Sequence, residues 1–200
     1  MKKRVAITGG IASGKSTAIR YIKSLGYPVF SCDEIYKQVI EQKEYIEKVA
    51  KAFPACIDDG RIDRKILSDV VFNDKQKLRE LNSIAHPLIM KELYKQMNEC
   101  ASPYVFAEVP LLFEGGYEED FDEVIVITRS LENRINDLMS RDRISKENAE
   151  KRIASQFDYD SESARTCLKK CKAIVIKNEG TVLELEKQLE DAISQNFPQP

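Results

Sequence analysis

Residues 9–17 combine glycines, a lysine and three hydroxyl side chains at a spacing that can hold a polyphosphate. The pattern Gly9-x-x-x-x-Gly14-Lys15-Ser16 is that of a P-loop. Glycines let successive main-chain N–H groups point at phosphate oxygens, Lys15 can reach the outer phosphates, and Ser16 can ligate Mg²⁺. The residues expected to contact phosphate are Gly9, Gly10, Ile11, Ala12, Ser13, Gly14, Lys15, Ser16 and Thr17. The sequence therefore predicts that a nucleoside triphosphate such as ATP binds here with Mg²⁺.

A carboxylate follows the second predicted strand. Phosphoryl transfer to a hydroxyl needs a group that orients and deprotonates the acceptor, and Asp33 in Ser31-Cys32-Asp33 stands where that group is required. The alternative is that Asp33 is an N-cap for the next helix. Glu108 ends the third predicted strand, where it either orients Mg²⁺ and its waters or is a plain polar strand end.

Four arginines lie in the second half of the chain, in a segment with helical periodicity. Arg134, Arg141, Arg143 and Arg152 can bind phosphate oxygens and cover the transferring group. Arg141 is the preferred ligand because it is expected at the end of its helix. For each arginine the alternative is a solvated helix face.

Two further residues are candidates for binding an acceptor. Arg64 follows the Asp59-Gly60 turn and can contact an acidic or phosphorylated group. His86-Pro87 is expected to begin a helix, since proline suits a first helical turn. His86 is then either a structural cap or an acceptor contact.

The elements that position these residues follow from apolar patterning. Continuous apolar runs predict buried parallel strands at 4–8, 28–31, 104–109, 123–128 and 173–177. Helical patterns separate them, so we expect an α/β fold: a three-layer P-loop NTPase core with a five-stranded parallel sheet, whose ligand lies beyond the carboxyl ends of the strands.

Two links between strands are much longer than a crossover requires. The first link carries a helical face of Ile35, Val39, Ile46, Val49 and Phe53. Asp63 follows and is expected to be the N-cap of a further helix. The second link predicts helices near 131–142, 146–157 and 161–171, and Thr181-x-x-Glu184 reads as a capping box. We therefore expect one domain, 1–200, with a core (1–32, 102–130 and 172–197), a helical acceptor-binding insertion (33–101) and an Arg-rich lid (131–171).

The composition of the chain limits which partners it can bind and in which compartment it is expected. A net charge of −2 argues against nucleic-acid binding. No apolar run reaches transmembrane length, so we expect no membrane insertion. Five cysteines without a C-x-x-C pair favour reduced thiols in the cytoplasm. We expect a monomer or a weak homo-oligomer.

The chain resembles the dephospho-coenzyme A kinase family over nearly its whole length. The matching residues are Thr8–Thr17, Asp33, Asp59–Arg64 with Leu67 and Val71-Phe72, His86–Ile89, Val109–Glu114, Arg141-Asp142, Arg152-Ile153 with Gln156, and Val175-Ile176 with Asn178-x-Gly180. The family usually has Asp-Ala-Asp where this chain has Ser31-Cys32-Asp33.

The resemblance implies ATP-dependent phosphorylation of the ribose 3′-hydroxyl of dephospho-CoA, which gives CoA and ADP in the last step of CoA synthesis. It implies that Asp33 is the general base, that Lys15 binds the ATP phosphates and that Arg141 is the lid arginine. The alternatives are a P-loop kinase of another small hydroxyl acceptor, such as a nucleotide or a sugar acid, and a non-catalytic nucleotide-binding module.

Overall fold

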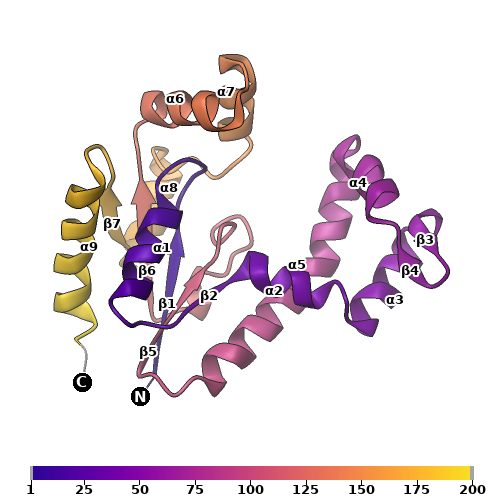
Figure 1. Ribbon diagram of the computed structural model, residues 1–200, viewed down its shortest axis with the longest axis horizontal. Coiled ribbons are helices and arrows are strands. Elements are labelled where there is room, and N and C mark those ends of the chain that lie inside the picture. Colours follow the sequence, from indigo (N-terminus) through magenta and orange to yellow (C-terminus); the bar gives the residue numbers. More distant parts are fainter. Residues whose placement is uncertain (1, 199–200) are drawn as a thin grey trace. The chain divides into compact units, whose positions relative to one another are not determined.

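The computed structural model describes residues 2–198 and divides into two compact units (Figure 1). The first combines Met1–Val29 with Cys100–Pro200 and is called the sheet unit. The second is Phe30–Glu99 and is called the helical unit. Among residues 2–198, no helix is both long and apolar enough to cross a bilayer.

Five strands form the main sheet, in the order β2-β5-β1-β6-β7. Their bounds are β1 Lys3–Thr8, β2 Val29–Ser31, β5 Tyr104–Glu108, β6 Glu123–Thr128 and β7 Ile174–Lys177. β1 pairs in parallel with β5 and β6, and β6 pairs in parallel with β7. The predicted α/β fold with a five-stranded parallel sheet is confirmed. The apolar runs reflect burial, since Val5, Ala6 and Ile7 of the central strand are fully buried.

Helices α1 (Lys15–Ser24) and α9 (Val182–Asn196) pack together against the sheet. Their apolar stripes supply Ile22 and Leu189 to the same buried cluster as Val5 and Ile125 of the strands. Thr181 and Glu184 form the expected capping box at the start of α9. This layer fixes the direction of α1, whose first turn continues the P-loop.

Three helices occupy the link between β6 and β7: α6 (Leu131–Asp142), α7 (Lys146–Ala154) and α8 (Glu162–Lys170). A short 3₁₀ helix, η2 (Glu118–Asp120), precedes β6. Within the sheet unit, α6 and α7 lie beyond the carboxyl end of β1 (Figure 1). They share a small apolar cluster of Ile135, Leu138 and Ala149, against which Ile11 and Ala12 of the P-loop pack. The P-loop is therefore in contact with α6 and α7.

The helical unit is built around one long helix. Its elements are α2 (Cys32–Val39), α3 (Lys43–Ala52), η1 (Pro54–Cys56), the hairpin β3 (Ile57–Asp58) and β4 (Arg61–Ile62), α4 (Arg64–Phe72) and α5 (Lys75–Glu99). α5 packs against α2, α3 and α4. Asp63 is the N-cap of α4, as expected, because its carboxylate accepts from the N–H groups of Lys65 and Ile66, both at 2.9 Å.

Three details of the helical unit differ from the sequence predictions. His86-Pro87 does not begin a helix, because α5 starts at Lys75 and Pro87 lies inside it. Proline removes only its own N–H from the helical ladder, and packing against three other helices compensates for that loss. The N-cap role that was the alternative for Asp33 is also excluded, because Ser31 is the N-cap and Asp33 is the second residue of α2.

The third difference is in the apolar face of α3. The sequence predicts that Ile46 faces the core, but the structure buries Tyr45, which is 1% exposed, and leaves Ile46 half-buried. Both positions are one helical turn from the buried Val49, so the spacing alone does not separate them.

Candidate functional site

The P-loop joins the carboxyl end of β1 to the first turn of α1. Gly14 is the N-cap of α1 with φ of +99°, a conformation that side chains with a Cβ rarely adopt. A Cβ there would also lie 2.2 Å from the Asn178 side chain. Gly14 therefore allows the chain to enter α1 with its first N–H groups exposed at the positive end of the helix dipole.

The Lys15 ammonium lies over this loop. Its Nζ donates to the carbonyls of Gly9 and Gly10 at 2.7 and 2.9 Å. The positive charge is thus held at the mouth of the loop, beside the main-chain N–H groups of the first turn of α1. This arrangement suits the binding of an anion.

A cavity of about 590 Å³ opens over the P-loop and α1. Its lining combines the loop, α6 and the start of α9: residues 11–17, Arg129, Asp137, Ser140, Arg141, Asn178, Gly180, Val182 and Leu185. The volume lies in the range of small-molecule and cofactor sites. Apolar side chains such as Val182 and Leu185 lie in the same cavity as the charged Lys15 and Arg141. A ligand that combines an aromatic base with a polyphosphate needs both kinds of surface.

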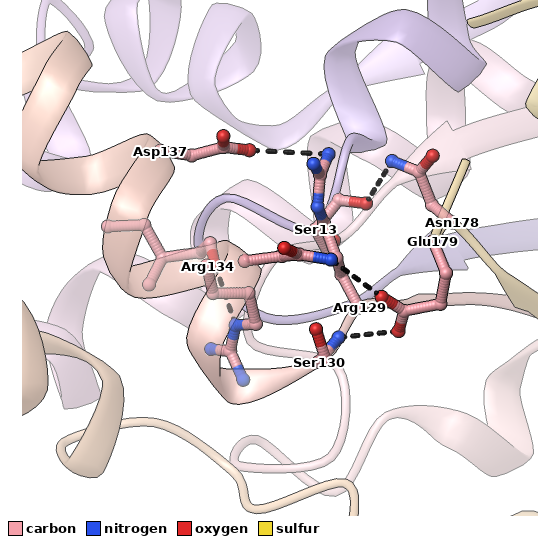
Figure 2. A network of polar contacts seen from close by, with 9 residues as sticks. Ser13, Arg129, Ser130, Arg134, Asp137, Asn178 and Glu179 are labelled. Atoms are coloured by element: carbon pink, nitrogen blue, oxygen red, sulfur yellow. Dashed lines mark hydrogen bonds and ion pairs between the residues drawn. The ribbon is translucent and has the colours of Figure 1, made fainter. Parts of the chain in front are cut away.

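A polar network joins the segment after β7 to the P-loop and to α6 (Figure 2). Asn178 is buried, and its Nδ2 donates to the Ser13 carbonyl at 2.9 Å. The Glu179 carboxylate accepts from the Ser130 N–H at 2.6 Å and from Asn133 Nδ2 at 3.0 Å. The segment after β7 therefore ties the back of the P-loop to the first turn of α6.

Of the four arginines named by sequence, only Arg141 lines the cavity that the described residues form over the P-loop. Its Nε and Nη2 donate to the carboxylate of Asp142 at 2.7 and 3.1 Å, and Arg152 Nη1 donates to the same carboxylate at 2.7 Å. The hydrogen bond from Arg141 lowers the pKa of Asp142. Arg143 is the exposed C-cap of α6. Contact of Arg141 with phosphate stays a prediction.

Arg134 lies elsewhere, buried beside the P-loop with 8% exposure. Its Nε donates to the Ile11 carbonyl at 2.9 Å. Burial excludes the solvated helix face that was one of the two interpretations of Arg134. The other interpretation, contact with phosphate, stays a prediction.

Two residues supply oxygen ligands of the kind that Mg²⁺ prefers. Ser16 has an exposed hydroxyl in the first turn of α1. Glu108 ends β5 in register with Ile7 of β1, next to the strand that leads into the P-loop. Within residues 2–198, no group of three or more His, Cys, Asp or Glu side chains is placed to hold a metal. The donor set fits an Mg²⁺ ion whose remaining ligands are phosphate oxygens and water.

The helical unit contains a second, larger cavity of about 1130 Å³. Polar residues on its wall include Asp33, Lys37, Arg61 and Arg64, and its apolar wall comes from α3, α4 and α5. Arg64 pairs with Glu41 at 2.6 Å on the exposed rim. Such a cavity can accept a long molecule that has both charged and apolar parts.

Tyr45 is the buried polar residue of this cavity. The ring packs edge to face against Tyr36 with ring centroids 6.3 Å apart, and burial raises the pKa of Tyr45. Tyr36 also contributes to the raised pKa, but among the described residues the Tyr45 hydroxyl makes no hydrogen bond of acceptable geometry, to Tyr36 or to any other group. A buried hydroxyl without a partner is costly, so a ligand group that accepts or donates a hydrogen bond there would be favoured.

His86 lies apart from the cavity lined by Asp33 and Arg64, as the described residues form it. It sits in the middle of α5, half-buried, and burial lowers its pKa. The structure therefore brings Asp33 and Arg64 to one cavity and leaves His86 outside it.

Sequence reasoning did not select several residues that line the cavity over the P-loop or contact the loop itself. Arg129 and Asp137 form an ion pair at 3.2 Å on the wall of that cavity. Asn178 and Gln156 were noted only as parts of a resemblance, without a role. Asn178 follows a strand and Gln156 follows a helix, and neither position predicts a contact with the P-loop. Their hydrogen-bond partners, Ser13 and Ile11, are more than 140 residues away in the chain.

Comparison with known proteins gives matches along nearly the whole chain. The family profile described as dephospho-CoA kinase matches residues 3–184. A dephospho-CoA kinase of Fusobacterium nucleatum is 38% identical over 189 residues, covering 93% of this chain and 94% of the relative. A solved structure from Thermus thermophilus has a TM-score of 0.78 at 31% identity and covers 98% of both chains. The dephospho-CoA kinase of Campylobacter jejuni has a TM-score of 0.61 at 30% identity, with 97% of each chain covered.

Proposed function

Because the chain belongs to the dephospho-CoA kinase family, we propose that it transfers the γ-phosphoryl group of ATP to the ribose 3′-hydroxyl of dephospho-CoA, giving CoA and ADP. The observation that carries the proposal is the family match over residues 3–184, since that range includes both the P-loop and the cavity of the helical unit. This reaction is the last step of CoA synthesis.

The sheet unit binds the phosphate donor. The P-loop N–H groups and Lys15 hold the phosphates of ATP, and Arg141 stabilises the charge on the transferring group. Residues 131–171 act as a lid that carries Arg141. Ser16 and Glu108 are the residues that would hold Mg²⁺ and its waters, and the ion would supply positive charge to the phosphates.

The helical unit binds the acceptor. Its cavity offers Lys37, Arg61 and Arg64 to the anionic groups of dephospho-CoA and an apolar wall to the rest of the molecule. Asp33 receives the proton of the 3′-hydroxyl as that oxygen forms its bond to phosphorus and ADP leaves. His86 contributes to this unit through packing within α5 rather than through the acceptor.

The proposed function also has consequences for where the enzyme acts. Its partners are small molecules, and the free thiols of its five cysteines suit the reducing cytoplasm. We propose that it acts there, without nucleic acid or membrane.

The test compares ATP turnover with four acceptors: dephospho-CoA, AMP, shikimate and gluconate. We expect turnover with dephospho-CoA alone, and a fall of at least about a hundredfold in kcat for Asp33→Asn. Glu34→Gln is the matched control, because Glu34 is the next residue of the same helical turn and is also exposed.

Three results would contradict different parts of the proposal. Turnover without preference for dephospho-CoA would exclude the acceptor, and ATP binding without turnover would favour a non-catalytic module. Equal kcat values for Asp33→Asn and the unmodified chain would exclude Asp33 as the base while leaving the reaction in place.

A further inference from the structure

The main chain of Ile11, at the tip of the P-loop, is held from two sides. Its N–H donates to Gln156 Oε1 at 2.6 Å, and its carbonyl accepts from Arg134 Nε at 2.9 Å. Arg134 belongs to α6, and Gln156 follows α7 by two residues. Two side chains from the link between β6 and β7 therefore determine where the loop tip lies.

Ala12, the next residue, has a backbone conformation that is unfavourable unless other contacts stabilise it. Ala12 has φ of +60°, a left-handed conformation that is unfavourable for a residue with a Cβ. Such a conformation persists only where the surroundings enforce it. The hydrogen bonds to Ile11 and the packing of Ile11 and Ala12 on α6 and α7 provide that enforcement.

Arg134 also brings a positive charge to the loop. Its guanidinium lies against Gly10, where a Cβ would stand 2.4 Å from Nη2. Nη2 is buried and has no hydrogen-bond partner among residues 2–198. Arginine stays protonated when buried, although burial lowers the pKa of Arg134 and Asp160 acts in the opposite direction.

A buried cation with an unused donor is unfavourable unless negative charge arrives nearby. A small cavity next to the guanidinium is lined by Gly10, Ser13, Thr128, Arg129, Tyr159 and Asp160. The carboxylate of Asp160 and the second cation, Arg129, carry opposite charges and face the same space. The anions expected at this loop are the phosphates of the nucleotide. Their charge would be stabilised by Arg134 across the thin main chain of Gly10, where no side chain intervenes.

We propose that Arg134 and Gln156 are positioning residues of the nucleotide site, and that the buried charge of Arg134 favours ligands in proportion to their phosphate charge. Gln156 acts only through the shape of the loop, whereas Arg134 acts through both shape and charge. The inference rests on the proposed binding of ATP at the P-loop.

The test measures equilibrium binding of adenosine, AMP, ADP and ATP to the full chain by calorimetry, together with thermal unfolding. Arg134→Met removes the charge at similar length, and Arg134→Lys keeps the charge but not the Nε–H donor. Arg165→Met, on the exposed face of α8, is the matched control. Gln156→Met tests the other side of the loop, with the exposed Gln195→Met of α9 as its control.

We expect Arg134→Met to weaken ATP binding at least about tenfold, ADP and AMP progressively less, and adenosine not at all. Arg134→Lys should recover most of the dependence on phosphate number. Gln156→Met should weaken ATP and ADP by the same factor, because it changes shape without charge. The two control variants should bind as the unmodified chain does.

An equal loss for adenosine and ATP in Arg134→Met, or a lower unfolding temperature with unchanged affinity ratios, would overturn the charge role. If Arg134→Met does not fold, the Lys and Gln156 variants decide: unchanged nucleotide affinity in both would overturn the proposal. Failure of the unmodified chain to bind any adenine nucleotide would instead refute the proposed function.

Discussion

The end of α8 offers a test of how backbone conformation affects stability. Lys172 follows the helix with φ of +51°, and its N–H donates to the Lys169 carbonyl at 3.2 Å. The Ala173 N–H donates to the Leu168 carbonyl at 2.9 Å. This pair of bonds is a Schellman motif, in which glycine is the preferred residue at the left-handed position. Lys172 occupies that position and is exposed.

The same motif ends α1 with the preferred residue in place. Gly26 has φ of +87°, its N–H donates to Lys23 at 3.0 Å, and the Tyr27 N–H donates to Ile22 at 3.4 Å. The chain thus contains a matched pair: one left-handed cap with glycine and one without it.

We expect Lys172→Gly to be more stable than Lys172→Ala by about 1 kcal/mol. The left-handed conformation costs a residue with a Cβ about 1–2 kcal/mol. Glycine avoids this cost, but its greater conformational freedom in the unfolded chain lowers the free energy of unfolding by about 0.4–1 kcal/mol. The difference between the two effects is the expected gain. Comparison with alanine, rather than lysine, removes the effect of losing a charge at the end of the helix.

Urea unfolding followed by circular dichroism gives the free energy of unfolding for each variant. For a chain of this size, thermal unfolding should shift by roughly 2–4 °C. Gly26→Ala should be destabilised by a similar amount, about 1 kcal/mol. If Lys172→Gly is no more stable than Lys172→Ala while Gly26→Ala is destabilised, the reasoning from φ at Lys172 is refuted.

Three further predictions concern the two cavities. Gly10→Ala should weaken ATP binding because its Cβ displaces Arg134. In a double-mutant cycle with Arg134→Met, the double variant should therefore lose less binding free energy than the two single variants together, and full additivity would contradict the contact. Asn178→Ala should raise the KM for ATP roughly three- to tenfold through loss of the Ser13 hydrogen bond, with Asn133→Ala as a control on the rim of the same network. Tyr45→Phe should raise the KM for dephospho-CoA but neither the KM for ATP nor the unfolding temperature, because the Tyr45 hydroxyl makes no hydrogen bond of acceptable geometry among the described residues. A lower unfolding temperature would show that the hydroxyl supports the fold instead, through its contact with Tyr36.

Local signals in the sequence were sufficient for the sheet and for several helix ends. Buried parallel strands require apolar residues on both faces, so runs such as residues 123–128 can be recognised without knowledge of their neighbours. Caps such as Asp63 and Thr181 involve residues within three positions of one another. The P-loop likewise depends on the spacing of nearby residues.

The helical unit shows where local signals fail. A proline after a histidine is a good helix start in isolation, but α5 continues through Pro87 because its packing outweighs one lost hydrogen bond. In α3, tertiary packing selected Tyr45 over Ile46 for burial, a choice that helical periodicity leaves open.

The sequence by itself determined a phosphate-binding loop at the end of a buried strand, because loop and strand are contiguous in the chain. Only the tertiary structure decided which distant side chains support that loop. Arg134 and Gln156 lie 123 and 145 residues from Ile11, and nothing in their own sequence neighbourhoods separates them from solvated polar residues. Burial and hydrogen-bond geometry make that distinction, and both arise only when the chain has folded.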